Sequence, residues 1–168
     1  MERSFRNFLS VLTAVIIAIG ATGCVKAQGF FFGNPLVGKP APDFTLQTLE
    51  GGARSLNDAI KGKKAIVFFW STWCPHCREQ IVDLSRQKAK LDAQGVAVLL
   101  VDIGESPNLV RRFASANKLD FEIWLDSEGA VSEMYQVFGI PTLIFIGDDG
   151  KVRASLHGLP EDYMELLK

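Results

Sequence analysis

Two cysteines separated by two residues are the side chains of this sequence best suited to chemistry. They lie in the segment Trp73-Cys74-Pro75-His76-Cys77, which follows a continuous apolar run and precedes a stretch with helical periodicity. In the first turn of a helix, positions three apart share one side, so the two sulfurs can close a disulfide with little backbone motion. The spacing therefore predicts a pair that interconverts between dithiol and disulfide.

The two cysteines are expected to have different roles. Cys74 would face the unpaired amide groups and the positive end of the helix dipole, and both lower the pKa of a thiol. Cys77 lies one turn further in, where it is more protected. We therefore expect Cys74 to react with the sulfur of a partner and Cys77 to resolve the mixed disulfide.

Three neighbouring residues are candidates for tuning this pair. Pro75 suits an early helical position, where its missing N–H costs nothing. His76 either adds positive charge that stabilises the Cys74 thiolate or is an exposed side chain with no electronic role. A more stable thiolate makes the pair more oxidising. Trp73 is the third candidate, because it directly precedes the first cysteine.

The periodicity around the pair predicts one α/β domain with a mixed central sheet flanked by helices. The runs at 65–70 and 96–101 are continuously apolar, as in strands buried on both faces. A short alternating run at 43–46, ended by Gly51-Gly52, predicts a hairpin at the front of the domain. The other expected elements are a helix from Trp73 to Gly95, helices at 107–117, 127–137 and 161–168, a strand at 121–124, and a closing hairpin of strands 142–146 and 152–156.

The composition excludes several classes of protein. The chain has 168 residues, of which 48% are hydrophobic and 22% charged, a profile unlike that of disordered or low-complexity chains. Lysine and arginine number 18 against 19 aspartate and glutamate, so the formal net charge is -1. Nucleic-acid binding, which uses a basic surplus, is therefore not expected. Three cysteines are also too few for a disulfide scaffold.

The first 23 residues have the pattern of a secretory signal. Arg3 and Arg6 precede an apolar run over 8–21, which is shorter than the roughly 20 residues of a bilayer span. The alternatives are an uncleaved membrane anchor and a buried N-terminal helix of the domain. The folded part of the chain is expected to be exported.

The end of this segment, Ala21-Thr22-Gly23-Cys24, resembles the lipobox of bacterial lipoproteins, although Ala21 stands where leucine is usual. Cys24 is the cysteine left without a partner, and lipidation would account for it. Cleavage after Ala27 by an ordinary signal peptidase is the competing possibility. The chain is accordingly divided into a signal peptide of lipoprotein type (1–23), a tether (24–39) and a single folded domain (40–168).

From Val37 to Lys168 the sequence resembles the thioredoxin superfamily, in particular its exported, membrane-tethered TlpA/ResA-like branch. The resemblance rests on GKPAPDF at 38–44, WSTWCPHCR at 70–78 and GIPT at 139–142. It implies a thioredoxin-like fold with an N-terminal β-hairpin extension. It also implies a thiol:disulfide oxidoreductase that works without a cofactor.

In this superfamily the proline before the penultimate strand is cis and faces the active-site disulfide. The resemblance assigns that position to Pro141, with the backbone of Ile140 offered to an extended substrate chain. A plain turn proline is the alternative, because only about 5–6% of X–Pro bonds in folded proteins are cis.

The sequence departs from the family at positions associated with proton transfer. Thioredoxin has a buried aspartate six residues before its first cysteine, where this chain has Phe68. TlpA-like proteins often have a glutamate three residues after the second cysteine, where this chain has Gln80, with Glu79 beside it. The acceptor of the Cys77 proton is therefore open between Glu79 and water.

Other functions fit fewer residues. A structural zinc site needs four ligands, and His76 is poorly placed between the cysteines to join them, so no metal is expected. A thioredoxin-fold copper chaperone would use both cysteines and His157, but such chaperones usually space their cysteines by three residues. The peroxidatic signature P-x-x-x-T-x-x-C is missing upstream of Cys74, where Val67 and Ser71 occupy its two specific positions.

The direction of exchange is left between two hypotheses. Resemblance to the TlpA/ResA-like branch favours a reductase that keeps cysteines of an apocytochrome c or a copper site in the thiol state. Pro75-His76 favours an oxidase, because DsbA-like oxidants carry the same pair between their cysteines. The reductase is the first hypothesis. Its implied partners are cysteine-containing exported proteins and a membrane protein that resets its redox state, and the chain itself would be a monomer tethered to a bacterial membrane on its periplasmic side.

Overall fold

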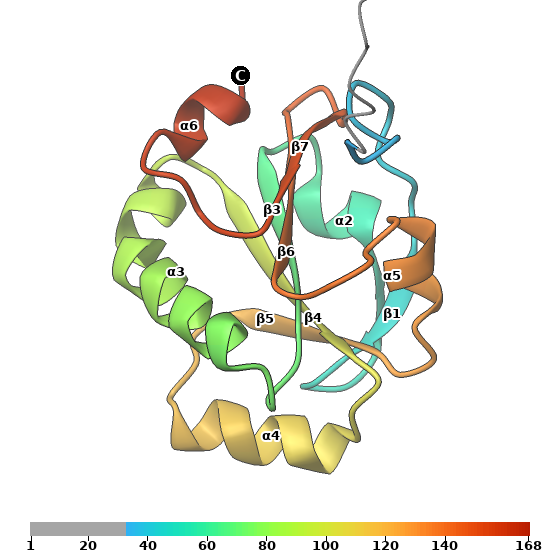
Figure 1. Ribbon diagram of the computed structural model, residues 1–168, viewed down its shortest axis with the longest axis vertical. Helices are drawn as coiled ribbons and strands as arrows, with labels where there is room; N and C mark the ends of the chain where they lie inside the picture. The colour runs from blue at the N-terminus through green and yellow to red at the C-terminus, as the bar shows by residue number, and fades with distance from the viewer. Residues whose placement is uncertain (1–32) are drawn as a thin grey trace, which may run out of the picture. The chain divides into compact units, whose positions relative to one another are not determined.

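The computed structural model describes residues 33–168, whose path is drawn in Figure 1. The signal pattern, Cys24 and most of the expected tether lie outside these residues. The described strands are β1 (Thr45–Thr48), β2 (Ala53–Ser55), β3 (Ala65–Trp70), β4 (Ala97–Ile103), β5 (Glu122–Asp126), β6 (Thr142–Ile146) and β7 (Val152–Leu156). The described helices are α2 (Leu56–Ile60), α3 (Pro75–Ala93), α4 (Pro107–Ala116), α5 (Ala130–Met134) and α6 (Tyr163–Leu166).

All seven strands form one mixed sheet in the order β2-β1-β5-β4-β3-β6-β7. β4 pairs in parallel with β3 and with β5. β6 and β7 run antiparallel to their neighbours, and the β1–β2 hairpin joins the sheet through an antiparallel pairing of β1 with β5. The predicted thioredoxin-like fold, with its mixed sheet and N-terminal hairpin, is therefore confirmed.

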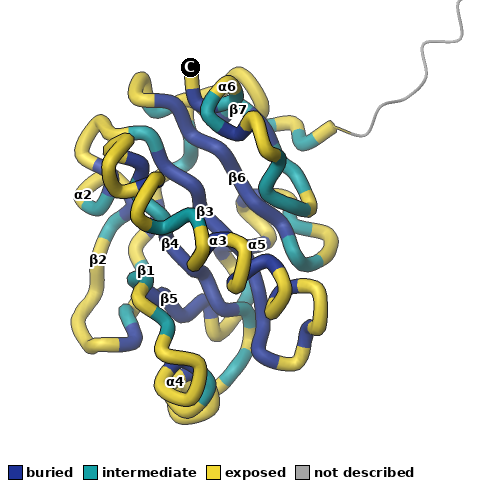
Figure 2. Tube along the Cα trace, turned by 90° about the vertical axis from the view of Figure 1, so that its left-hand side faces the viewer, coloured by how far each residue is buried: buried dark blue, intermediate teal, exposed yellow. Residues whose placement is uncertain are grey.

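β3 lies between two hydrophobic cores, because successive side chains of a strand point to opposite faces of the sheet. Phe68 and Trp70 belong to the core that includes residues of α3, α4 and α6. Val67 and Phe69 belong to the core that includes residues of α2 and α5. Every residue of β3 is buried, and Figure 2 shows buried segments along β3, β4 and β6. The carboxyl end of β3 is thus held from both faces.

α3 is the long helix that follows the cysteine pair. It begins at Pro75, and its buried residues Ile81, Leu84 and Leu91 lie on one face that packs into the first core. The helix ends at Ala93, and Gly95 follows with a φ of 68°, the left-handed conformation that glycine adopts readily. The expected helix therefore has the predicted limits within two residues.

Three short helices differ from the expectation. α2 was not predicted, because five residues are too few for a recognisable period; the Ser55 side chain caps it by accepting a hydrogen bond from the Asp58 amide (3.1 Å). α5 and α6 are shorter than the predicted 127–137 and 161–168. At α5, the Asp126 carboxylate accepts hydrogen bonds from the amides of Val131 and Ser132.

The segment before β1 is hydrogen-bonded to the rest of the domain. The Gly38 amide donates to the Val152 carbonyl (2.8 Å), and the Val152 amide donates to the Lys39 carbonyl (2.9 Å). The Asn34 side-chain amide donates to the Tyr135 carbonyl (2.8 Å). The last residues of the segment assigned to the tether are therefore attached to β7 and to the end of α5. Between residues 33 and 168, none of the helices has the length and apolar character needed to cross a membrane.

The two-core arrangement predicts a large loss of stability when a central aromatic side chain is truncated. Phe68 is fully buried, so Phe68→Ala should lower the free energy of unfolding by about 3–5 kcal/mol. Phe138 is 92% exposed, and the matched substitution Phe138→Ala should change it by less than about 0.5 kcal/mol. Chemical denaturation followed by circular dichroism measures both; equal losses would contradict the assigned core.

Candidate active site

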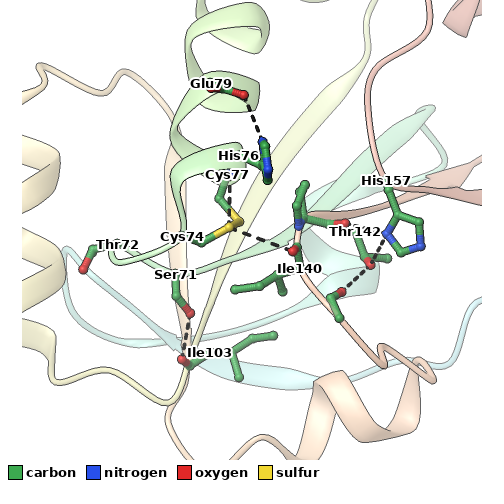
Figure 3. The surroundings of a disulfide bond; sticks show 12 residues. Ser71, Thr72, Cys74, His76, Cys77, Glu79, Ile103, Ile140, Thr142 and His157 are labelled. Carbon is green, nitrogen blue, oxygen red and sulfur yellow. Dashed lines mark hydrogen bonds and ion pairs between the residues drawn. A yellow bond between two sulfur atoms is a disulfide. The ribbon is translucent and has the colours of Figure 1, made fainter.

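The cysteine pair lies where β3 ends and α3 begins. Cys74 is the N-cap residue of α3, and its sulfur accepts a hydrogen bond from the Cys77 amide (3.2 Å). Pro75 occupies the first turn, where an amide would have had no helical partner. Cys74 and Cys77 form a disulfide, with their Cα atoms 5.2 Å apart (Figure 3). The sequence pattern and the geometry therefore agree on the pair and on the helix start.

The two cysteines are both buried and differ slightly in residue exposure. Cys74 is 4% exposed, whereas Cys77 is fully buried and belongs to the core with Ile81 and Leu84. A partner sulfur approaching from solvent would therefore meet Cys74 first. The Cys74 sulfur is also the one that receives the helix-terminal amide, an interaction that favours a thiolate over a thiol.

A loop far along the chain faces the disulfide. The peptide bond between Ile140 and Pro141 is cis, and the Ile140 carbonyl oxygen lies 3.9 Å from the Cys74 sulfur. Figure 3 shows this carbonyl directed at the sulfur. The Thr142 hydroxyl donates to the Gly139 carbonyl (2.7 Å) and so closes the loop on itself. Tertiary structure thus brings together residues that are 66 positions apart.

His157 contacts the far side of the same loop and not the cysteines. Its Nδ1 lies 2.7 Å from the Pro141 carbonyl and 3.4 Å from the Thr142 hydroxyl. A carbonyl only accepts, so Nδ1 carries the hydrogen in this contact. Within residues 33–168, no three histidine, cysteine, aspartate or glutamate side chains come together as metal ligands would. A copper site would therefore require His157 to leave its present partner.

The remaining candidate tuning residues lie at the surface. Trp73 is 67% exposed, in contrast to the fully buried Trp70 of β3. The His76 Nδ1 lies 3.1 Å from the Glu79 carboxylate, and both side chains are largely exposed. Figure 3 shows the imidazole directed toward Glu79. A carboxylate at this distance partly offsets any positive charge that His76 presents to Cys74.

The two departures from the family pattern are both buried. Phe68 is fully buried in the first core and has no group that could take up a proton. Gln80 is 8% exposed, and its side-chain oxygen accepts a hydrogen bond from the Leu159 amide (3.0 Å). Gln80 therefore serves as a link between α3 and the segment after β7, and it has no ionisable proton to exchange with Cys77.

Sequence reasoning missed a pair of acidic residues at the carboxyl end of β4. The amide and the hydroxyl of Thr72 both donate to the Glu105 carboxylate, the hydroxyl at 2.7 Å. The Glu105 amide in turn donates to the Asp102 carboxylate (3.3 Å). Burial raises the pKa of Asp102 from its ordinary value of 3.8 to about 8, and the neighbouring Glu105 adds to the shift. The available signal was an aspartate directly after the apolar run at 96–101.

A disulfide that caps a helix and faces a cis-proline loop on this sheet defines the class: the protein is a thiol–disulfide oxidoreductase of the thioredoxin-like fold. The chain belongs to the AhpC/TSA family, whose family model matches residues 37–155. The match includes the entry segment, the cysteine pair and the cis-proline loop.

Known relatives agree with this class. The chain is 31% identical to the thiol-disulfide oxidoreductase ResA of Bacillus subtilis, over all of this chain and 97% of that protein. The crystal structure of StoA from Bacillus subtilis is similar with a TM-score of 0.64 and 29% identity, covering 80% of this chain and 100% of that one. A secreted disulfide oxidoreductase of Mycobacterium tuberculosis is similar with a TM-score of 0.63 and 25% identity, covering 72% of this chain and 90% of that one.

The buried Asp102 predicts a stability that depends on pH. An unfolded chain ionises this carboxyl above about pH 4, whereas the folded protein retains its proton up to about pH 8. Between these values the unfolded state binds fewer protons, so the free energy of unfolding falls as pH rises. Asp102→Asn removes this pH dependence. The free energy of unfolding of the variant, minus that of the unmodified protein, should therefore rise by about 1.4 kcal/mol per pH unit between pH 5 and 7.

Urea denaturation at several pH values measures this difference. Asp148→Asn is the matched control, because Asp148 is exposed on the turn between β6 and β7; its curve should stay parallel to that of the unmodified protein. A parallel curve for Asp102→Asn would contradict the raised pKa.

Proposed function

We propose that this chain is an exported thiol:disulfide reductase that uses Cys74 and Cys77 to reduce disulfides in other exported proteins. The observation that carries the proposal is the position of the Cys74 sulfur. It accepts a hydrogen bond from the Cys77 amide at the start of α3, and the Ile140 carbonyl oxygen lies 3.9 Å from it. A sulfur placed in this way has a stabilised thiolate and a main-chain group beside it for an incoming peptide.

In the proposed reaction, the Cys74 thiolate attacks one sulfur of a substrate disulfide. The substrate S–S bond breaks, one substrate cysteine leaves as a thiolate, and a mixed disulfide joins Cys74 to the other. Cys77 then loses its proton to solvent and attacks the Cys74 sulfur, which releases the second substrate cysteine. Two electrons pass to the substrate, its two cysteine thiolates take up protons from solvent, and the Cys74–Cys77 disulfide is formed.

The docking role belongs to the cis-proline loop in this proposal. An extended substrate chain would bind the backbone of Ile140 and so place its cysteine next to Cys74. Pro141 would keep this segment in position, with the Thr142 hydroxyl bonded to Gly139 behind it. Trp73 and Phe138 are large exposed apolar side chains adjacent in sequence to these two segments, and they would contact substrate side chains on either side.

Resemblance to the TlpA/ResA-like branch favours the reductase. The relative with 31% identity is named a thiol-disulfide oxidoreductase ResA, which agrees with that branch and gives no direction of exchange. In addition, the Glu79 carboxylate lies beside His76, so the charge that would make a Pro75-His76 pair oxidising is partly offset. The oxidase is the second candidate, because the Pro75-His76 pair itself is present.

The cellular setting is inferred from the N-terminal segment. The signal pattern and Cys24 support export and lipid anchoring, and one similar solved structure is of a secreted protein. We infer that the monomeric domain faces the periplasm from a membrane anchor. A membrane protein would return electrons to the Cys74–Cys77 disulfide after each turnover, because the proposed reaction leaves the pair oxidised.

The direction of exchange is tested by a redox titration in glutathione buffers of the full-length protein in detergent. We expect a reduction potential near or below about −270 mV, as in reductants of this chemistry. A value near about −120 mV would assign the protein to the oxidants instead. No reversible interconversion of the pair would reject both candidates.

The roles of the two cysteines are tested by trapping with a peptide that contains one disulfide. Cys77→Ser should accumulate a mixed disulfide through Cys74, because the resolving thiol is absent. Cys74→Ser, the matched control, should form at least tenfold less, since Cys77 is buried. Mass spectrometry of the adducts distinguishes them, and adducts formed mainly by Cys74→Ser would reverse the assignment.

A further inference from the structure

The turn that carries Cys74 is fastened to the end of β4 at two neighbouring residues. The Ser71 hydroxyl donates to the Ile103 carbonyl (3.1 Å), and Figure 3 shows this contact below the disulfide. Thr72 directs both its amide and its hydroxyl to the carboxylate of Glu105. The turn itself is closed by a hydrogen bond from the Cys74 amide to the Ser71 carbonyl (3.2 Å). A displacement of Glu105 would therefore be passed on to Cys74.

These contacts to Glu105 are shielded from water. Thr72 is 9% exposed and Glu105 is half-buried, so the two hydrogen bonds to the carboxylate are made in a medium less polar than water. Hydrogen bonds to an ionised acceptor are about twice as strong as bonds between neutral groups. An amide side chain at position 105 could accept from the Thr72 amide and donate to the Thr72 hydroxyl, but neither bond would have an ionised acceptor.

Glu105 also places a charge close to Cys74. Thr72 and Cys74 are two residues apart, which limits their Cα separation to about 7.6 Å. With the hydrogen bond and side-chain bonds at each end added, the carboxylate held by Thr72 lies within roughly 14 Å of the reactive sulfur, and the partial burial of Glu105 reduces the screening of its charge. A negative charge at this distance disfavours a thiolate and so favours the thiol form of Cys74.

We propose that Glu105 is a positioning residue for the dithiol: it fixes the turn that carries Cys74, and its charge makes the Cys74–Cys77 pair more reducing. The inference rests on the proposed thiol–disulfide exchange at Cys74. It means that a residue outside the cysteine motif helps to set the direction of that exchange. A thiolate that is less stable leaves the reduced form less favoured, which lowers the reduction potential of the pair.

Other charged groups at this end of the sheet do not replace Glu105. Asp102 is mostly protonated at neutral pH because burial raises its pKa to about 8. Asp126, which pairs in register with Ile103, directs its carboxylate to the amides at the start of α5. On the first turn of α3, His76 and Glu79 face each other. Arg78 also lies on this turn, directly after Cys77. Glu105 is therefore the carboxylate that accepts from Thr72 at this end of the sheet.

The test compares the full-length protein with Glu105→Gln in glutathione redox buffers and in the pH profile of Cys74 alkylation. We expect Glu105→Gln to shift the equilibrium with glutathione at least about threefold toward the reduced pair. At 29.6 mV per tenfold change, this corresponds to a potential about 14 mV less negative. The pKa of Cys74 should fall by about 0.5 unit in the same variant.

Two variants control the measurement. Glu105→Asp keeps the charge and should restore an equilibrium constant closer to that of the unmodified protein than to that of Glu105→Gln. Glu50→Gln removes an exposed carboxylate on the β1–β2 turn and should change neither quantity. The proposal is overturned if Glu105→Gln behaves like Glu50→Gln, or if Glu105→Asp shifts the equilibrium as far as Glu105→Gln does.

A measurement on the unmodified sequence keeps the proposal testable if Glu105→Gln does not fold. In the reduced protein, the carboxyl carbon resonance of Glu105 should show a step at the pKa of Cys74 measured by alkylation. If the chemical shift of this carbon does not change at the pKa of Cys74, the inference is overturned. The proposed function has separate criteria: it fails if the unmodified protein does not interconvert reversibly between dithiol and disulfide, or if its reduction potential lies near about −120 mV.

Discussion

The contact between the Cys77 amide and the Cys74 sulfur is the interaction on which the site depends. The first amides of a helix have no partner within the helix, and this one is satisfied by a sulfur that can also carry charge. The same contact caps α3 and prepares the thiolate. Because a cap operates only at the first turn, the chain must place Cys74 at the start of the helix and hold the preceding turn still.

The sheet supplies that support from both faces. β3 is buried along its whole length, and α3 packs the core that begins directly below the disulfide. The antiparallel pairing of β6 with β3 brings the loop before β6 over the same strand end, so the Ile140 carbonyl reaches the Cys74 sulfur. His157 and Thr142 then hold this loop from its far side. Reactive group and docking loop are thus positioned by one central strand.

The charges around the pair explain why the sequence motif alone is ambiguous. Read in isolation, Pro75-His76 suggests a stabilised thiolate and an oxidant. In the folded chain, Glu79 lies against His76, and Glu105 stands behind the turn that carries Cys74. Both carboxylates act against the thiolate. The direction of thiol exchange is therefore a property of the surroundings of the motif as much as of the two residues within it.

Local patterns were sufficient to predict the cysteine pair, the long helix after it and the mixed sheet, because apolar periodicity and helix-start signals act over a few residues. The short helix α2 and the limits of α5 were not predictable in this way, since a side-chain cap and a carboxylate from a neighbouring strand define them. The loop of Ile140 and Pro141 was assigned to the disulfide by motif resemblance, and no local pattern predicted it. Only tertiary structure could place His157 behind Pro141 and Glu105 at Thr72. These contacts join segments that are 16 and 33 residues apart, and such distances carry no periodic signal that a sequence could reveal.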